Sequence, residues 1–401
     1  MHRISDITSQ LDPDFLLEQL HATDQFAKAN VEASRGGPFG ASLHVIDLDT
    51  GERVQVGTLA ANAVLKTGIA SQHAEAEALS PDNQRALRYT LGEFKKQGKT
   101  NVAVLCTSSG QSCPACHAKQ EIVARDLVSK GLLEKGKFVV TYGATFEDTA
   151  QIAGFNDAPY VLDNIRRLQT SSQACMVKVE HRHITDLPED IKRRLMIAQA
   201  DSRPIAFLHG ANVQIEGRDH RNHDLFASAE VTAIRTACDR QNNQKLPTPW
   251  MLGNRDDAPQ KEAVLYTAIH SPGPLLLAEA QWAGVSRIMC VGGVVHASSA
   301  LRETPEVPNP SFAKALWSGY NRADSYLTVL RVMPFENIAQ HAWREKLARE
   351  GAAILYNGLA SDPALAAYAD EMTARFSGHT IMCKVPAARL APAARPEPTR
   401  T

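Results

Sequence analysis

The chain has 401 residues, of which 44% are hydrophobic, and a formal net charge of −1. This length predicts two or three domains with full cores, and the near-neutral charge argues against a surface built to bind polyanions. The seven cysteines have no framework spacing, so a disulfide scaffold is not expected. The polar N-terminus does not resemble a signal peptide, and no apolar run approaches the roughly 20 residues needed to span a bilayer. We therefore expect a cytoplasmic protein with no membrane contact.

Helical and extended patterns alternate through the first part of the chain. Asp12 followed by Pro13 is typical of a helix start, and the glycine-rich stretch 36–40 ends that helix. The alternation that follows predicts a layered α/β domain. Strands are expected at 41–47, 53–60, 102–107 and 137–143, and helices after His73, at 84–97 and from Cys113 to about 133.

Two short motifs in this region supply the ligands of a metal site. His73 and Glu75 open one helix, and Cys113 and Cys116 lie in the first turn of another. Cysteines three residues apart can reach one ion, and the amides of a helix N-terminus favour thiolate over thiol. A catalytic zinc site needs three protein ligands and an open position for water, whose protons a carboxylate can transfer. Ser71 is expected to cap the His73 helix.

Two other interpretations fit parts of this pattern. A lone Cys-x-x-Cys is also typical of redox-active proteins and of structural zinc sites. A structural site would need a fourth ligand, for which His117 is available although it is adjacent to Cys116. Because both motifs open helices that follow strands, we favour catalytic zinc.

The order α-β-β-α-β-α-β, with His-x-Glu followed by Cys-x-x-Cys, resembles the cytidine deaminase-like superfamily. Residues 36–40 resemble the glycine-proline-phenylalanine-glycine segment of bacterial guanine deaminases, nucleoside deaminases and tRNA adenosine deaminases, and Asn62 matches their base-binding asparagine. The stretches 141–148 and 154–157 look most like the guanine and nucleoside deaminase branch. The resemblance covers roughly residues 13–165.

This resemblance implies a role for each matching residue. His73, Cys113 and Cys116 would bind Zn²⁺, and Glu75 would transfer protons during hydrolysis. The substrate-binding residues implied are Asn62 and the backbone of Ala74, which orient the base, Phe39 and Phe155, which wall the pocket, and Asp157, which hydrogen-bonds the substrate.

The sequence departs from the family pattern around the cysteines. Ser112 stands where proline is usual, and His117 and Lys119 stand where small neutral residues are common. We expect His117 and Lys119 to face solvent.

The second half contains a degraded copy of the same motifs. Residues 227–235 have the form of the His73 helix, with Ser228 in place of histidine and with Glu230 retained. Downstream, Gly273 and Leu276 occupy the two cysteine positions. Serine, glycine and leucine do not hold zinc against water, so this copy is expected to bind no metal.

These observations predict two cytidine deaminase-like, three-layer α/β/α domains with mixed central sheets. The catalytic domain would span 1–168 and the degenerate, metal-free domain 176–385, with a flexible tail at 386–401. A helix at 337–350 is expected to pack on the second domain.

Three functions remain open at this point. The first is a zinc-dependent deaminase of a small heterocycle, a purine-type base such as guanine or a related base or nucleoside. The second is a tRNA adenosine or cytidine deaminase with a non-catalytic second domain, which the net charge of −1 and the 6% aromatic content argue against. The third is a non-catalytic zinc-binding protein, which has no use for Glu75. We expect a small-molecule heterocycle as partner, neither nucleic acid nor membrane, and either a homodimer or a second domain that replaces a subunit.

Overall fold

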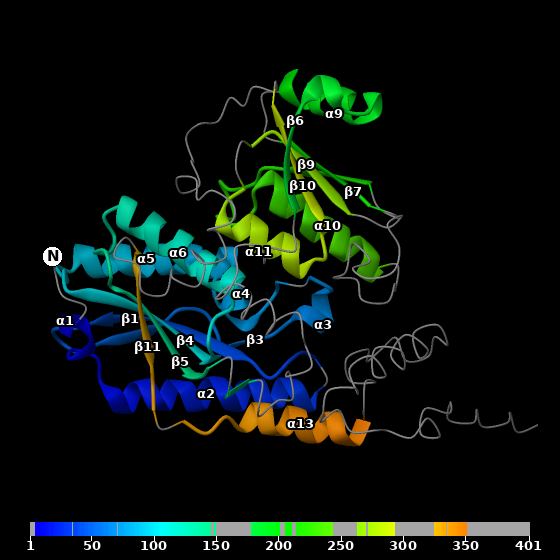
Figure 1. Ribbon diagram of the computed structural model, residues 1–401. Coiled ribbons are helices and arrows are strands. Elements are labelled where there is room, and N and C mark those ends of the chain that lie inside the picture. The colour runs from blue at the N-terminus through cyan, green and yellow to red at the C-terminus, as the bar shows by residue number, and fades with distance from the viewer. Residues whose placement is uncertain are drawn as a thin grey trace, which may run out of the picture.

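The computed structural model describes residues 5–33, 35–69, 71–145, 148–149, 178–200, 205–210, 214–243, 263–269, 272–292, 325–333 and 335–350. Within these ranges the chain forms a six-stranded and a five-stranded mixed β-sheet, each packed against helices (Figure 1). The predicted α/β fold class with two mixed sheets is confirmed. None of the described helices has the length and hydropathy needed to cross a membrane.

The first sheet has the order β11-β5-β4-β1-β2, with β3 paired to the start of β1. β1 runs antiparallel to β2, β3 and β4, whereas β4, β5 and β11 are mutually parallel. β1 and β4 are buried along their whole length because helices cover both faces of the sheet. The expected strand at 53–60 is two short strands. The bounds are β1 (Gly40–Asp47), β2 (Arg53–Gln55), β3 (Ala60–Ala61), β4 (Val102–Gly110), β5 (Phe138–Ala144) and β11 (Leu327–Arg331).

The first long helix begins where the sequence predicts a cap. Asp12 accepts a hydrogen bond from the N–H of Asp14 (3.0 Å), and Pro13 follows in the first turn of α2. A glycine lets this helix approach the sheet, because a Cβ on Gly40 would lie 2.0 Å from the carbonyl oxygen of Thr23. The helices are α1 (Ser5–Thr8), α2 (Pro13–Glu32), α3 (Val64–Thr67), α4 (Ala74–Ala78), α5 (Pro81–Lys96) and α6 (Pro114–Ser129).

The second sheet repeats the strand order and directions of the first. Its order is β6-β10-β9-β7-β8, with β7 antiparallel to β8 and β9, and with β9, β10 and β6 parallel. These strands correspond to β11, β5, β4, β1 and β2 of the first sheet. The elements are β6 (Lys178–His183), a 3₁₀ turn (Ile184–Asp186), α9 (Glu189–Ala200), β7 (Ile205–His209), β8 (Gln214–Arg218), α10 (Ala229–Asn243), β9 (Val264–Thr267), α11 (Pro274–Trp282) and β10 (Arg287–Gly292).

The two halves exchange their fifth strands. β6 follows the first half in sequence but pairs with β10 of the second sheet, whereas β11 follows the second half but pairs with β5 of the first. After β11, helix α13 (Ile338–Glu350) lies along α2. The helix expected at 337–350 is therefore present, but it packs on the first half and not on the second.

One hydrophobic core joins the two halves. Apolar side chains from the facing sides of both sheets form a continuous cluster with those of α5, α6, α10 and α11. Helices α2 and α13 cover the outer face of the first sheet and α9 that of the second (Figure 1). The helices that carry the candidate site thus lie between the sheets.

Candidate metal centre

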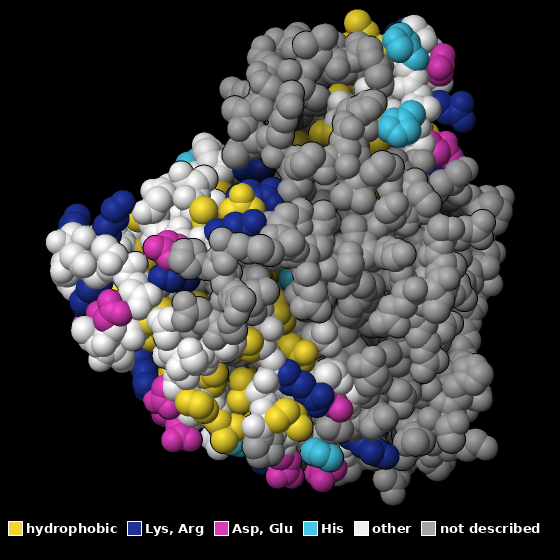
Figure 2. Space-filling view, turned by 60° about the vertical axis from the view of Figure 1, so that its left-hand side comes forward, with side chains coloured by type: hydrophobic (Ala, Val, Ile, Leu, Met, Phe, Trp, Pro, Cys, Tyr) yellow, Lys and Arg dark blue, Asp and Glu magenta, His cyan; other side chains and the backbone are white. Residues whose placement is uncertain are grey.

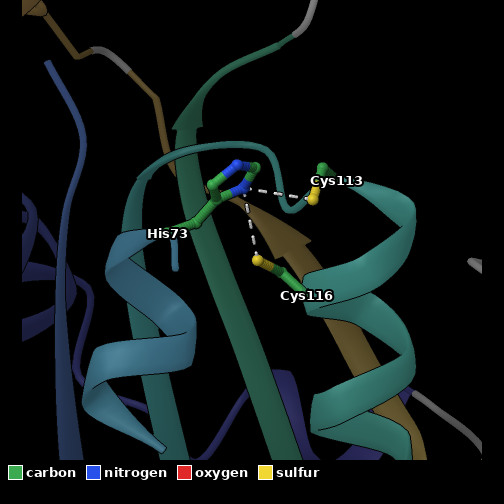
Figure 3. Close-up of side chains that lie close together, drawn as sticks. All are labelled: His73, Cys113 and Cys116. Atoms are coloured by element: carbon green, nitrogen blue, oxygen red, sulfur yellow. Dashed lines mark hydrogen bonds between the residues drawn. The ribbon is translucent and has the colours of Figure 1, made fainter. Parts of the chain in front are cut away.

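Three ligand atoms converge at the predicted site. The ligand atoms of His73, Cys113 and Cys116 all lie within 4.8 Å of one another, the only such metal-binding group among the described residues. Nδ1 of His73 is 3.3 Å from Sγ of Cys113 and 3.6 Å from Sγ of Cys116 (Figure 3). Bonds of about 2.0–2.3 Å to a tetrahedral zinc ion would separate its ligand atoms by roughly 3.6 Å. The donor types and their spacing therefore fit a metal such as zinc.

Two helix N-termini place these ligands. His73 is the N-cap residue of α4 and Cys113 that of α6, and neither side chain caps its own helix. Their side chains point from the two helix ends toward each other (Figure 3). Ser71 does not cap α4, because its side chain is bound elsewhere, to Lys119 and Glu279.

The two thiols differ in acidity. Burial opposes ionisation of Cys113, but hydrogen bonds from Cys116 and His73 and the charge of the imidazole outweigh it and hold the pKa of Cys113 well below its usual value. Burial and the charge on Cys113 raise the pKa of Cys116. One thiolate thus forms readily beside the imidazole, and a cation at this point would favour ionisation of the second.

Glu75 lies beside the three ligands with its carboxylate in the interior. The residue is 5% exposed, and the hydroxyl of Ser108 on β4 donates a hydrogen bond to its Oε1 (3.2 Å). Burial raises the pKa of Glu75, the charge on Cys113 raises it further, and His73 partly opposes the shift. A buried carboxyl group with a raised pKa next to three candidate metal ligands is suited to proton transfer.

Three of the five predicted substrate-binding residues lie together beside this site. The N–H of Asn62 donates to the carbonyl oxygen of Phe39 (3.0 Å), and Phe39 packs against Ala74 and neighbouring alanines. The side-chain oxygen of Asn62 accepts from the N–H groups of Gly37 (3.4 Å) and Val64 (3.2 Å), which fixes the orientation of its amide. Phe155 and Asp157 lie outside the described residues.

The expectation that His117 and Lys119 face solvent is wrong. His117 is 5% exposed. Lys119 is fully buried, because α11 of the second half packs against α6. Burial also lowers the pKa of His117 to about 4, so this imidazole is neutral. Lys119 instead pairs with Glu279 of α11 at 2.9 Å. Sequence reasoning missed Glu279, although it follows Leu276 by one helical turn as Lys119 follows Cys116.

In the second half, the positions that match the ligands have structural roles. The hydroxyl oxygen of Ser228 accepts a hydrogen bond from the N–H of Val231 (3.3 Å) at the start of α10. Leu276 is part of the hydrophobic core. Glu230 is buried and accepts a hydrogen bond from Thr267 on β9 (2.5 Å). The second half thus keeps a carboxylate next to a strand hydroxyl, but none of its three positions that match the ligands carries an imidazole or a thiol.

Compared with models of known protein families and with curated proteins, the chain matches none of them. The function is therefore argued from the site itself.

Proposed function

We propose that this chain is a zinc-dependent hydrolytic deaminase that releases ammonia from an aminated heterocycle. The observation that carries the proposal is the buried Glu75 carboxylate beside three metal ligands, two thiols and one imidazole. A purely structural zinc site would be closed by a fourth ligand and would not need an adjacent buried carboxylate. The His-x-Glu and Cys-x-x-Cys motifs, each at a helix start, support the same conclusion.

The residues of the site have separate tasks in this reaction. Zinc held by His73, Cys113 and Cys116 would lower the pKa of a water toward about 7 and stabilise negative charge at the reacting carbon. Glu75 accepts a proton from the attacking water and delivers it to the adjacent ring nitrogen. Glu75 then takes the remaining proton of the attacking oxygen and passes it to the amine, so that ammonia departs as this oxygen becomes the new carbonyl. Ser108 holds the carboxylate in place through its hydrogen bond.

A purine-type base such as guanine, or a related base or nucleoside, is the substrate class we propose. Asn62, with its amide orientation fixed, and the backbone N–H of Ala74 would bind polar edges of the ring, and Phe39 would contact its face. We also propose Phe155 and Asp157 as pocket residues, on the resemblance alone. On the face of the first half that Figure 2 shows, basic and acidic side chains are interspersed, which does not favour a nucleic-acid groove on that face.

We expect Glu75→Ala to retain zinc and to lose ammonia release by at least about 100-fold, because it removes the proton carrier without removing a ligand. The matched control is Glu230→Gln, which changes the corresponding buried carboxylate of the metal-free half and should leave turnover intact. Zinc content measured by mass spectrometry and ammonia measured enzymatically separate the two effects. Full activity in Glu75→Ala would refute the mechanism.

The substrate class is tested on the wild-type protein with a panel of free bases, nucleosides and tRNA. Ammonia release from a free base or nucleoside supports the proposal, whereas release from tRNA alone identifies a nucleic-acid deaminase. Bound zinc with no release from any substrate would favour a non-catalytic protein.

A further inference from the structure

Two oppositely charged side chains meet in the interior between the halves. Nζ of Lys119 on α6 lies 2.9 Å from Oε1 of Glu279 on α11, and the two side chains are 0% and 2% exposed. These helices lie side by side between the two sheets (Figure 1). A buried ion pair must offset the loss of hydration of both charges, so it is weak evidence for stability alone. Its hydrogen bonds to Ser71, in the loop that precedes His73, indicate another role.

The pair joins equivalent points of the two motif copies. Lys119 follows the ligand Cys116 by one helical turn, and Glu279 follows Leu276, which stands at the same place in the second copy. In the same way, Ala278 of α11 belongs to one apolar cluster with Cys113, Ala115 and Cys116. The second half therefore packs on the helix that carries the two thiols with its own matching helix.

Both charges bind the loop that delivers the histidine ligand. Nζ of Lys119 donates to the main-chain oxygen of Ser71 (3.0 Å) and to its hydroxyl oxygen (3.3 Å). The hydroxyl of Ser71 in turn donates to Oε2 of Glu279. Ser71 precedes His73 by two residues, so a displacement of this pair would move the backbone that positions the imidazole.

Glu279 is held in place by a second residue of its own half. Nη2 of Arg235 on α10 lies 3.3 Å from Oε1 of Glu279, and Nη1 of the same guanidinium lies 3.3 Å from Asp224. Burial opposes ionisation of Glu279, but Lys119, Arg235 and the Ser71 hydroxyl together lower its pKa to about 2. The carboxylate is therefore a fixed negative charge at neutral pH.

We propose that Lys119 and Glu279 are a positioning pair through which the metal-free half fixes the geometry of the zinc site. The pair connects the His73 loop, the Cys116 helix and α11 in one network, so both kinds of ligand are oriented by a residue of the second half. The inference rests on the proposed zinc site, but it concerns metal binding and requires no deamination.

The test is the zinc affinity of the full-length chain, measured by competition with a chromophoric chelator. Glu279→Gln and Lys119→Met should each weaken zinc binding by about 10–100-fold, the usual effect of removing a partner that orients metal ligands. The double variant should be no weaker than either single variant, because the two residues act as a unit. The matched control is Arg88→Met. Arg88 on α5 pairs with Asp126 (2.9 Å) on α6, the helix that also carries Lys119, so this ion pair lies within the first half. The variant should bind zinc normally.

Cobalt substitution adds a readout of geometry, because the visible d–d bands should shift in Glu279→Gln and stay unchanged in Arg88→Met.

Should Glu279→Gln not fold, Ser71→Ala decides the question, since it removes the bridging hydroxyl and leaves both charges paired. Ser71→Ala should also weaken zinc binding. Wild-type affinity and cobalt spectrum in folded Glu279→Gln, or in Ser71→Ala, would overturn the inference. A wild-type chain without deaminase activity, but with pair-dependent zinc binding, would refute the proposed function and leave this inference intact.

Discussion

At the scale of single residues, the surroundings of three nearby cysteines give them different chemistry. Cys106 on β4 is fully buried and receives a hydrogen bond from Gln120 (3.6 Å), and burial raises its pKa to about 12. Cys113 and Cys116 lie at a helix N-terminus next to an imidazole, and there the pKa of Cys113 is held well below its usual value although burial opposes its ionisation. Cys106 is therefore a neutral core residue, whereas Cys113 and Cys116 are suited to bind metal.

This difference predicts which cysteine substitutions remove the metal. Cys113→Ser and Cys116→Ser should each abolish stoichiometric zinc binding, because serine is a poor zinc ligand. Cys106→Ser, on the neighbouring strand, should retain one zinc ion per chain. Metal analysis of the purified proteins checks the prediction, and loss of zinc in Cys106→Ser would contradict it.

The sequence alone could identify the candidate metal ligands but not the residues that hold them in place. Each ligand motif is local, and its spacing at a helix start predicts where the side chains can point. The pairing of Lys119 with Glu279 depends on α11 packing against α6, which no local pattern records, and a buried lysine is rare unless it is paired. The same packing explains why Ser71 bonds to the second half when its position suggests a helix cap.

At the scale of elements, α2 and α13 stabilise each other's ends. Asp24 of α2 accepts hydrogen bonds from the N–H groups of Ile338 (2.7 Å) and Ala339 (3.2 Å), at the start of α13. Lys346 of α13 donates from its buried ammonium group to the carbonyl oxygens of Val31 (2.8 Å) and Glu32 (3.1 Å), at the end of α2. Each contact places a charge where the helix dipole favours it. A helix from the far end of the sequence is thus fixed to the first half.

These contacts predict a pH-dependent effect of Asp24. Burial raises its pKa from 3.8 to about 6, so its contribution to stability is fully present below about pH 4 and is lost as the pH rises through about 6. Asp24→Asn should cap α13 at every pH and remove this dependence, whereas Asp24→Ala should cost about 1 kcal/mol through loss of the cap. Urea unfolding at pH 5 and pH 8 measures both effects. Equal pH dependence in wild type and Asp24→Asn would contradict the assignment.

The local sequence pattern predicted most elements, but it did not predict where β11 and the helix after it would pack. The strands at 41–47, 102–107 and 137–143 and the helix at 337–350 were all predictable from their apolar pattern and boundaries, and all are present. The pairing of β11 with β5 was not, since a parallel strand pair can close over any long connection and neither strand specifies its neighbour. The helix that follows β11 was therefore expected on the wrong half.

At the scale of the whole molecule, strand exchange and a shared core make the halves interdependent. Each sheet obtains its fifth strand from the stretch that follows the other half in sequence, and one apolar cluster spans both sheets. The first half alone would expose the edge of β5 and the inner faces of α5 and α6. Exposed strand edges and large apolar faces favour aggregation.

A chain divided between residues 176 and 177 tests this interdependence. The fragment 1–176 produced alone should be aggregated or unable to retain zinc, because it lacks β11, α13 and Glu279. Co-production with 177–401 should yield a complex that copurifies and binds zinc. Gel filtration and metal analysis decide the outcome, and a monomeric fragment 1–176 with bound zinc would show that the first half folds on its own.

The capping role of Ser228 opposes the gain of a metal site in the second half. As the residue that caps α10, it stabilises the helix that in the other half begins at a metal ligand. A single substitution to histidine would remove that cap and add one ligand where Gly273 and Leu276 offer none. A new metal site would need three changes together, and the first of them would lower stability without any gain in binding. The folding energetics of the second half therefore oppose the appearance of a second metal site.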